Sequence, residues 1–317
     1  MDRMRIDDLI DRQKLRRRLS FWRVLALGGA LVAVILLTVL MLDPEALGQK
    51  SADHIAHVKI ESTITEDEDL LKRLETIKES PRAKGLIITM DSPGGSVAGG
   101  EALYEIVREI ADEKPAITQV GGMAASAGYM ISVGTDHIVA RKSSIIGSIG
   151  VIFQYPNVDG LLEDWGVEMR TIKSTPKKAE PNYFGTPPPG AEEGIRAMIL
   201  DTYDWFKFIV AEQRGFDEAT ITRLADGSVF TGRQALELGL VDAIGGMDTA
   251  KDWLTEQGLD EDLNIVLYEP ENVSSSSLFL GSAMRIVGLE DELAAARRFQ
   301  DRVLLDGLLS IWHVGNN

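Results

Sequence analysis

A run of small residues with a single hydroxyl group is the feature that most limits how this chain can fold. Four of the five residues before Ser126 are Gly or Ala, and this run, residues 121–129, follows an apolar stretch at residues 116–120. A helix-compatible stretch comes next, so Ser126 is predicted to lie at a tight turn from a strand to a helix. Such a turn exposes the serine Oγ at a helix N-terminus, which suits a nucleophilic serine. The competing interpretation is that Ser126 only caps the helix.

The rest of the chain outside its ends reads as alternating strands and helices. Apolar stretches bounded by turn residues predict strands at residues 54–60, 85–90, 116–120, 137–140 and 145–153. Apolar residues at helical spacing predict helices at residues 67–78, 98–110, 192–212 and 217–225. Because strands and helices alternate, the sequence predicts one domain of α/β fold over residues 54–270.

Two segments depart from this alternation. Residues 174–192 contain five prolines and form an irregular stretch, with Lys177 and Lys178 side by side. Residues 271–317 begin with a polar stretch that includes four serines in a row, and we expect a linker there followed by a helical extension. Within this extension, residues 289–309 are amphipathic and are interpreted as an ordinary packing helix.

Nineteen residues without a charged side chain, residues 24–42, separate two regions of opposite charge. As a helix they would span roughly 28 Å, close to the ~30 Å core of a bilayer, so we expect one transmembrane helix. A cleaved signal peptide is the competing interpretation, but its apolar region is usually only about 7–15 residues long. Residues 1–23 carry a net charge of +4 and are expected to stay in the cytoplasm. Residues 43–53 would then link the anchor to a domain outside, which in a bacterium is the periplasm or the cell exterior.

The composition excludes several kinds of chemistry. The chain has no cysteine, which rules out disulfides, thiolate catalysis and cysteine-ligated metals. Because the whole chain has a net charge of −16, residues 24–317 carry −20 and would repel the phosphates of a nucleic acid. No motif requires a metal or a nucleotide, so no cofactor is expected.

A nucleophilic serine needs a general base, and the residues alone leave its identity open. The chain has four histidines: His54, His57, His137 and His313. His137 begins a predicted core strand, where a structural histidine is the commoner outcome. A lysine can replace histidine only when burial or nearby positive charge keeps its amine neutral. Three lysines lie in or beside the proline-rich stretch: Lys173, Lys177 and Lys178.

Backbone donors for an oxyanion are easier to predict. Gly94 and Gly95 follow the predicted strand at residues 85–90, so a backbone N–H of one of them is expected at the carboxyl end of the sheet. Together with the N–H of Ala127, next to the serine, it would supply two donors for a tetrahedral intermediate. The competing interpretation is a Pro-Gly turn without a catalytic role.

Three motifs together resemble the signal peptide peptidase A family of serine proteases: residues 91–95, 122–129 and 147–151. Residues 226–235 and 239–242 are also similar to that family, and the resemblance covers roughly residues 54–255. One predicted anchor followed by one protease unit looks like the short form of the family.

The resemblance implies a Ser/Lys dyad made of Ser126 and Lys178, with Lys177 as the neighbouring alternative and Ser148 as support for the lysine. It implies a fold similar to the Clp protease subunit and the crotonases, a spiral of ββα units. The histidine position of the Clp-type triad is Val151 here, which favours the lysine. In short-form members the dyad looks to be completed between neighbouring subunits of a ring.

The chain is therefore interpreted as a serine endopeptidase anchored in a bacterial cytoplasmic membrane. Its expected substrates are apolar peptides, and the resemblance implies remnant signal peptides among them. Two alternatives use the same fold: a crotonase-type acyl-thioester enzyme, which would not need Ser126, and an inactive membrane scaffold.

Overall fold

The computed structural model describes residues 22, 25, 27–32, 50–270 and 309–311, and the chain divides into two units, Met1–Ala52 and Asp53–Asn317. The described residues of the first unit between 22 and 32 are helical. None of the helices in the described ranges combines the length and apolarity needed to cross a membrane. Most of the predicted anchor at residues 24–42, and the leader before it except Trp22, lie outside the described residues.

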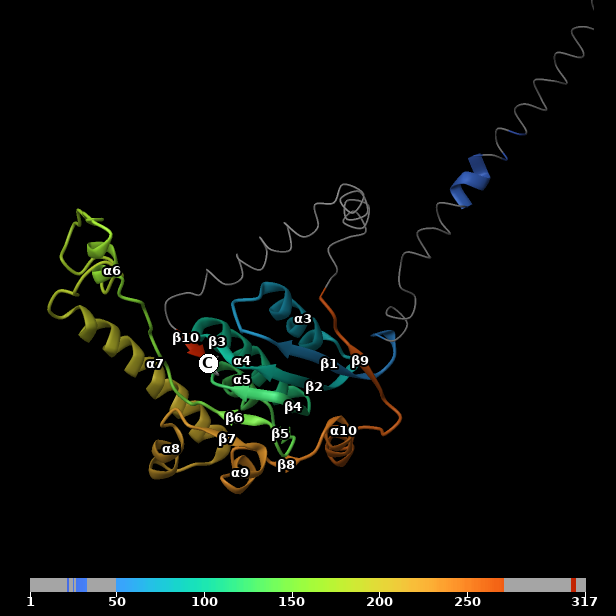
Figure 1. Ribbon diagram of the computed structural model, residues 1–317. Helices are drawn as coiled ribbons and strands as arrows, with labels where there is room; N and C mark the ends of the chain where they lie inside the picture. Colours follow the sequence, from blue (N-terminus) through green and yellow to red (C-terminus); the bar gives the residue numbers. More distant parts are fainter. Residues whose placement is uncertain (1–21, 23–24, 26, 33–49, 271–308, 312–317) are drawn as a thin grey trace, which may run out of the picture. The chain divides into compact units, whose positions relative to one another are not determined.

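The second unit is built on an eight-stranded sheet (Figure 1). Strands β7, β6, β4, β2, β1 and β9 lie side by side in that order, while β5 pairs with β4 and β8. All of these pairs are parallel except β6 with β7. The strands are β1 His54–Glu61, β2 Ala83–Ser92, β4 Ala116–Ala125, β5 His137–Ala140, β6 Ile145–Gly147, β7 Val229–Thr231, β8 Ala243–Ile244 and β9 Asn264–Leu267. A separate antiparallel pair joins β3 Gly94–Ser96 to β10 Leu309–Ile311.

Helices connect the strands of this unit. They are α3 Glu68–Glu79, α4 Val97–Glu113, α5 Ala127–Ser132, α6 Asp159–Asp164, α7 Ala191–Arg214, α8 Glu218–Leu224, α9 Gly232–Glu237 and α10 Met247–Glu256. The predicted α/β fold is confirmed. Its continuous apolar stretches form the central strands of a largely parallel sheet.

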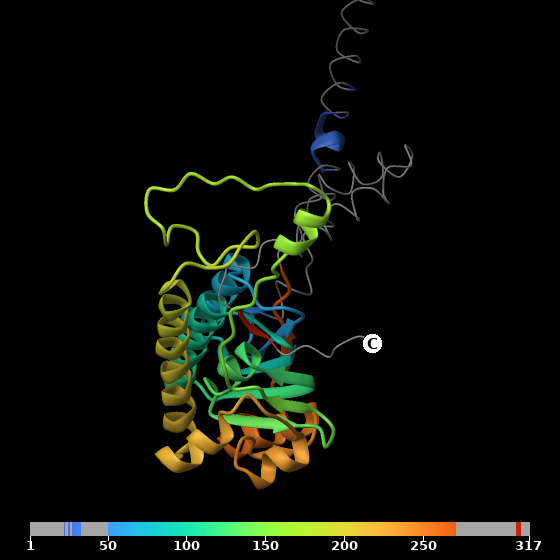
Figure 2. The same cartoon turned by 60° about the vertical axis from the view of Figure 1, so that its left-hand side comes forward.

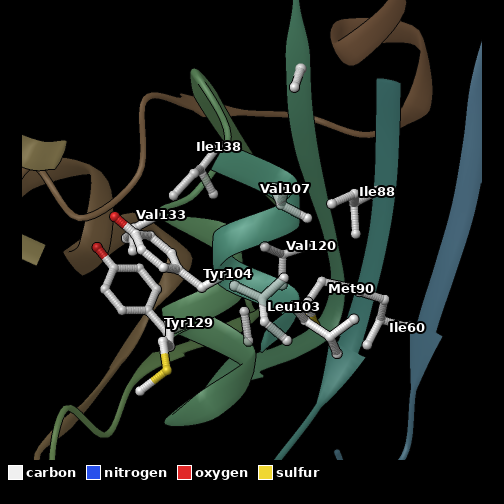
Figure 3. Close-up of a cluster of buried hydrophobic side chains, with 14 of the residues drawn as sticks. Ile60, Ile88, Met90, Leu103, Tyr104, Val107, Val120, Tyr129, Val133 and Ile138 are labelled. Carbon is white, nitrogen blue, oxygen red and sulfur yellow. The ribbon is translucent and has the colours of Figure 1, made fainter. Parts of the chain in front are cut away.

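Both faces of the central strands are buried, because alternate side chains enter two different cores. On β2, Ile88 packs in the larger core with residues of α3 and α4, whereas Ile87 packs with Leu254 of α10. Figure 3 shows Leu103 and Val107 of α4 directed at the strands in the larger core. This two-sided burial explains why β2 reads as a continuous apolar run.

Two predicted elements differ from the structure. The strand expected at residues 145–153 ends at Gly147, because Gly147 and Ser148 have positive φ angles of 108° and 53° and turn the chain away from the sheet. The helix expected at residues 289–309 lies outside the described residues except for Leu309, which belongs to β10 and is therefore a strand residue.

A long segment joins β6 to α7, and we call residues 148–190 the β6–α7 arm. Its only regular helix is the short α6, and Figures 1 and 2 both show the part around α6 extending away from the sheet. Several of its apolar side chains are exposed, among them Trp165 at 72% and Ile172 fully. The arm therefore carries apolar surface that the described chain leaves uncovered.

Candidate active site

Three parallel strands end at one edge of the sheet. Ser92 at the end of β2 is in register with Ala124 of β4, and Ala125 is in register with Gly147 at the end of β6. Ser126 follows β4 directly, so it lies where the carboxyl ends of β2, β4 and β6 meet. In α/β folds this edge is where ligands bind and chemistry takes place.

Ser126 has an unusual backbone conformation, with φ 55° and ψ −118°. A positive φ is uncommon in a residue other than glycine and persists only where its surroundings enforce it. Here the Ser126 N–H donates to the Gly147 carbonyl over 2.8 Å, and its own carbonyl accepts from Met130 N–H over 2.9 Å. Ser126 is the N-cap residue of α5, as the competing interpretation expects, but its side chain makes no capping hydrogen bond to the helix. The tight strand-to-helix turn is confirmed.

The start of α5 is packed tightly beside Ser126. A side chain at Gly128 would come within 3.1 Å of the Ser92 carbonyl oxygen, and one at Gly100 within 3.0 Å of the Ala127 Cβ. Ala127 occupies the first position of α5, where a backbone N–H has no partner within the helix. Its N–H is therefore available beside the serine, as the oxyanion prediction requires.

The two glycines of residues 91–95 are in different situations. The Gly94 N–H donates to the Ser92 hydroxyl over 3.1 Å, and that hydroxyl donates to the Ser62 carbonyl over 2.6 Å. Ser92 is fully buried, so this small network is protected from water. Because its N–H is already engaged, Gly94 is the weaker of the two predicted oxyanion donors.

The backbone N–H and carbonyl of Gly95 face the other edge of β3. Ile64 N–H donates to the Gly94 carbonyl and Ser96 N–H donates to the Ile64 carbonyl, each over 2.9 Å. Since backbone groups alternate along a strand, the N–H and carbonyl of Gly95 point away from Ile64. A Cβ at Gly95 would lie 1.8 Å from the Ile64 oxygen, so only glycine fits there. That edge of β3 is where Ser310 of β10 is in register with Gly95. Gly95 stays the predicted second oxyanion donor, because its N–H faces the edge at which an extended chain pairs.

Ser148 lies at the carboxyl edge of the sheet, directly after the end of β6. It follows Gly147, whose carbonyl holds Ser126, and its own N–H donates to the Ser228 carbonyl over 2.7 Å. Ser148 is 9% exposed. Ser148 thus follows the residue that holds the Ser126 backbone, and its role in supporting the lysine stays a prediction.

The three candidate lysines all belong to the β6–α7 arm. Lys173 forms an ion pair with Glu180, and its side chain is only 17% exposed. The Lys173 amine is therefore already engaged by a carboxylate of its own arm. The Lys177 Nζ lies against Gly190 at the start of α7, 2.7 Å from the position of a Cβ there. Lys178 is exposed and makes no hydrogen bond to Ser126 within the described chain.

His137 is far from Ser126. It pairs with Ile117 near the start of β4, whereas Ser126 follows the other end of that strand. At about 3.3 Å per residue, roughly 25–30 Å of strand separates them. The His137 ring stacks on Trp253 with centroids 4.9 Å apart, and burial lowers its pKa. His137 is therefore a packed structural residue and not the base.

The other histidines of the described chain lie on β1. The Nε2 atom of His54 lies 2.9 Å from the Tyr268 hydroxyl, and that of His57 lies 2.8 Å from Thr89 Oγ1. His313 is outside the described residues. No group of three or more His, Asp and Glu side chains is placed to hold a metal within the part that the structure describes.

The sequence alone does not predict the role of Ser92 in this site. Ser92 belongs to a motif that the sequence singles out, but its hydroxyl bridge between Gly94 and Ser62 depends on the folded backbone. The nearest signal is its position directly after an apolar strand and before a Pro-Gly turn.

Comparisons with known proteins assign this fold, with its small-residue turn at Ser126, to a class of hydrolases, the serine peptidases. The family model "Peptidase family S49" matches residues 108–259, and the model "Clp protease" matches residues 50–146. Among the relatives, a Synechocystis sp. protein named as a protease is 37% identical over 194 residues, 61% of this chain and 70% of that one. The chain belongs to peptidase family S49.

Two further relatives carry more specific names. An Enterococcus faecium protein named as a signal peptide peptidase SppA is 35% identical over 219 residues, 68% of this chain and 63% of its own length. "Protease 4" of Haemophilus influenzae is 30% identical over 255 residues, 75% of this chain and 41% of its own length. The chain thus spans less than two thirds of both of these relatives.

Proposed function

We propose that this protein is a serine endopeptidase in which Ser126 is the nucleophile. The observation that carries the proposal is the backbone conformation of Ser126, a positive φ held by a neighbouring strand at the carboxyl edge of the sheet. A nucleophilic serine at a strand-to-helix turn has this kind of strained backbone, which projects its Oγ out of the turn. Ser62 and Ser148 also have positive φ angles, and what distinguishes Ser126 is its place between the end of β4 and the start of α5.

The reaction follows from the groups at this edge. The Ser126 Oγ attacks the peptide carbonyl carbon, and its proton passes to the amine of the lysine base. The oxyanion that forms accepts hydrogen bonds from the N–H groups of Gly95 and Ala127. The lysine then donates the proton to the leaving amine, the C–N bond breaks, and an acyl-enzyme remains. Water, deprotonated by the same lysine, hydrolyses this ester and releases Ser126.

We assign the base to Lys178 of a neighbouring copy of the chain. Lys178 is exposed on the β6–α7 arm, and the part of this arm around α6 extends away from the sheet. The exposed Trp165 and Ile172 of the same arm offer apolar surface that a second copy would cover. Such an arrangement repeated around an axis closes into a ring, with each dyad shared by two copies.

The proposed protease is anchored by residues 24–42 in a bacterial cytoplasmic membrane. The uncharged length of this segment and the basic residues 1–23 before it support one span with the catalytic domain on the outer side. Remnant signal peptides are apolar and lie in the same membrane. The name of the Enterococcus faecium relative supports them as substrates.

A peptidase assay on the detergent-solubilised full chain tests this proposal. The wild-type protein is expected to cleave an apolar signal-peptide substrate, and the Ser126→Ala variant is expected to leave it intact with unchanged folding by circular dichroism. Cleavage by Ser126→Ala at the wild-type rate would overturn the assignment of the nucleophile.

A further inference from the structure

A short loop of the β6–α7 arm carries the proposed base Lys178, and we call residues 173–180 the lysine loop. Every residue between the two ends of this loop is exposed. The Lys178 N–H donates to the Thr175 carbonyl over 3.1 Å. Ala179, next to the base, has a φ of 59°, which a residue other than glycine keeps only where its surroundings enforce it. Because the exposed residues bury little apolar area, the conformation of the loop depends on how its two ends are held.

The ion pair between Lys173 and Glu180 joins the two ends of the lysine loop. The Glu180 side chain is only 7% exposed. Its Oε1 atom accepts from the Lys173 amine and, over 2.6 Å, from the side-chain amide of Asn182. The carbonyl of the next residue, Tyr183, accepts from the Val158 N–H over 2.9 Å. These bonds attach Glu180 to the start of the arm, and Glu180 in turn holds Lys173.

The burial of the Glu180 carboxylate has a cost in stability. Its second oxygen, Oε2, is buried and accepts no hydrogen bond within the part of the chain that the structure describes. A buried acceptor without a partner lowers the free energy of unfolding. Apolar residues of similar volume often replace a buried ion pair with no loss of stability. The geometry that the pair imposes on the lysine loop therefore explains its presence better than stability does.

We infer that Glu180 is a positioning residue for the base: by pairing with Lys173 it closes the lysine loop and holds the Lys178 amine in the place where Ser126 of a neighbouring copy uses it. This inference rests on the proposed function. Glu180 itself does not contact the reacting atoms. A displacement of about 1 Å in a group that transfers a proton lowers the rate strongly. The loss is expected in kcat and not in KM, because Lys178 is assigned to proton transfer and not to substrate binding.

Kinetics of Glu180→Leu test the inference, because leucine fills similar space but cannot pair with Lys173. Its kcat on an apolar peptide is expected to fall by about ten- to hundredfold, with KM, Tm and oligomer size unchanged. Glu180→Gln should keep most of the wild-type kcat, since its amide oxygen still accepts from Lys173 and Asn182. The matched control is Glu168→Leu, because Glu168 also pairs with a cation of the arm, Arg170, but both side chains are exposed. A wild-type kcat in Glu180→Leu, or equal losses in Glu180→Leu and Glu168→Leu, would overturn the inference.

Hydrogen–deuterium exchange separates this inference from the proposed chemistry. In the full-length Ser126→Ala chain, adding Glu180→Leu is expected to speed exchange of the backbone amides in the lysine loop by about three- to tenfold. Adding Glu168→Leu should leave their exchange unchanged. Unchanged exchange in Glu180→Leu would overturn the inference even if the wild-type protein cleaves peptides. Faster exchange there, with no hydrolysis by the wild type, would support the role of Glu180 in holding the loop and contradict only the proposed function.

Discussion

The Ser92 hydroxyl accepts a hydrogen bond from the Gly94 N–H over 3.1 Å and donates one to the Ser62 carbonyl. Through these two bonds, a fully buried side chain fixes the backbone that leads into Gly95. Ser92 is therefore a positioning residue: it holds the backbone of the oxyanion donor in place and does not itself need to contact the reacting atoms.

Ser92→Ala is expected to destabilise the fold by about 1–3 kcal/mol, because a buried N–H and a buried carbonyl lose their partner. It should also lower kcat, since the Gly95 N–H is no longer held in place. The matched control is Ser144→Ala, because the buried Ser144 hydroxyl likewise accepts from a backbone N–H, that of Arg141, and donates to backbone carbonyls, over 2.6 Å to Gly121 and 3.4 Å to Val120. Thermal unfolding should show similar losses for both, with kcat reduced only in Ser92→Ala. A wild-type kcat in Ser92→Ala would contradict the positioning role.

The two adjacent lysines of the arm should behave differently. Lys178→Ala is expected to abolish hydrolysis, because the proton from Ser126 then has no acceptor. Lys177→Ala should retain most of the activity, since the Lys177 Nζ lies against Gly190 of its own arm. Initial rates on one apolar peptide, with oligomer size measured on the same samples, provide the check. An active Lys178→Ala with an inactive Lys177→Ala would move the base by one residue.

Mixing two inactive variants tests whether the dyad is shared. If Lys178 of one copy serves Ser126 of the next, oligomers assembled from Ser126→Ala and Lys178→Ala chains contain some sites with both groups. Such mixtures, dissociated and reassembled together, should recover a fraction of the wild-type rate, whereas each variant reassembled alone stays inactive. Mixed oligomers that remain fully inactive would show that serine and lysine come from the same chain.

The stability of the domain should fall on mild acidification. Burial lowers the pKa of both His57 and His137 in the folded state. The unfolded chain, with histidine pKa values near 6.5, therefore binds protons first as the pH falls. This part of the stability is complete above about pH 6.5 and is lost as the pH drops toward the folded-state values.

Thermal unfolding between pH 8 and pH 5 provides the measurement. His57→Gln is expected to show a shallower decline in Tm than the wild type over this range. Comparing the two removes the effects of the acidic surface, which both proteins share. Parallel declines in Tm would contradict a role for His57.

Local sequence signals predict much of this fold. The apolar runs that became β2 and β4 read as buried strands because both of their faces are covered, and the Gly and Ala run before Ser126 predicts the turn that the structure contains. The early end of β6 was not predictable, since the apolar pattern continues to Phe153 while the positive φ of Ser148 turns the chain. Long-range pairings leave no local trace, which is why the sequence predicts no strand at residues 309–311.

The candidate site also has features that the sequence predicts and features that it does not. The sequence places Ser126, Gly95 and Ala127 at strand ends, and a largely parallel sheet brings such ends together. It does not reveal that Ser92 engages Gly94, because that contact depends on backbone direction. The dyad of Ser126 and Lys178, and its completion by a second copy of the chain, stay predictions, because one chain does not reveal the contacts between copies.

The central claim, that Ser126 is the nucleophile, is tested most directly by a fluorophosphonate probe on the detergent-solubilised full chain, with the modified residue located by mass spectrometry. We predict a single covalent adduct on Ser126 in the wild type, no adduct in Ser126→Ala, and loss of hydrolysis in proportion to labelling. Full inhibition with the adduct on another residue, or hydrolysis that persists after Ser126 is completely labelled, would contradict the account.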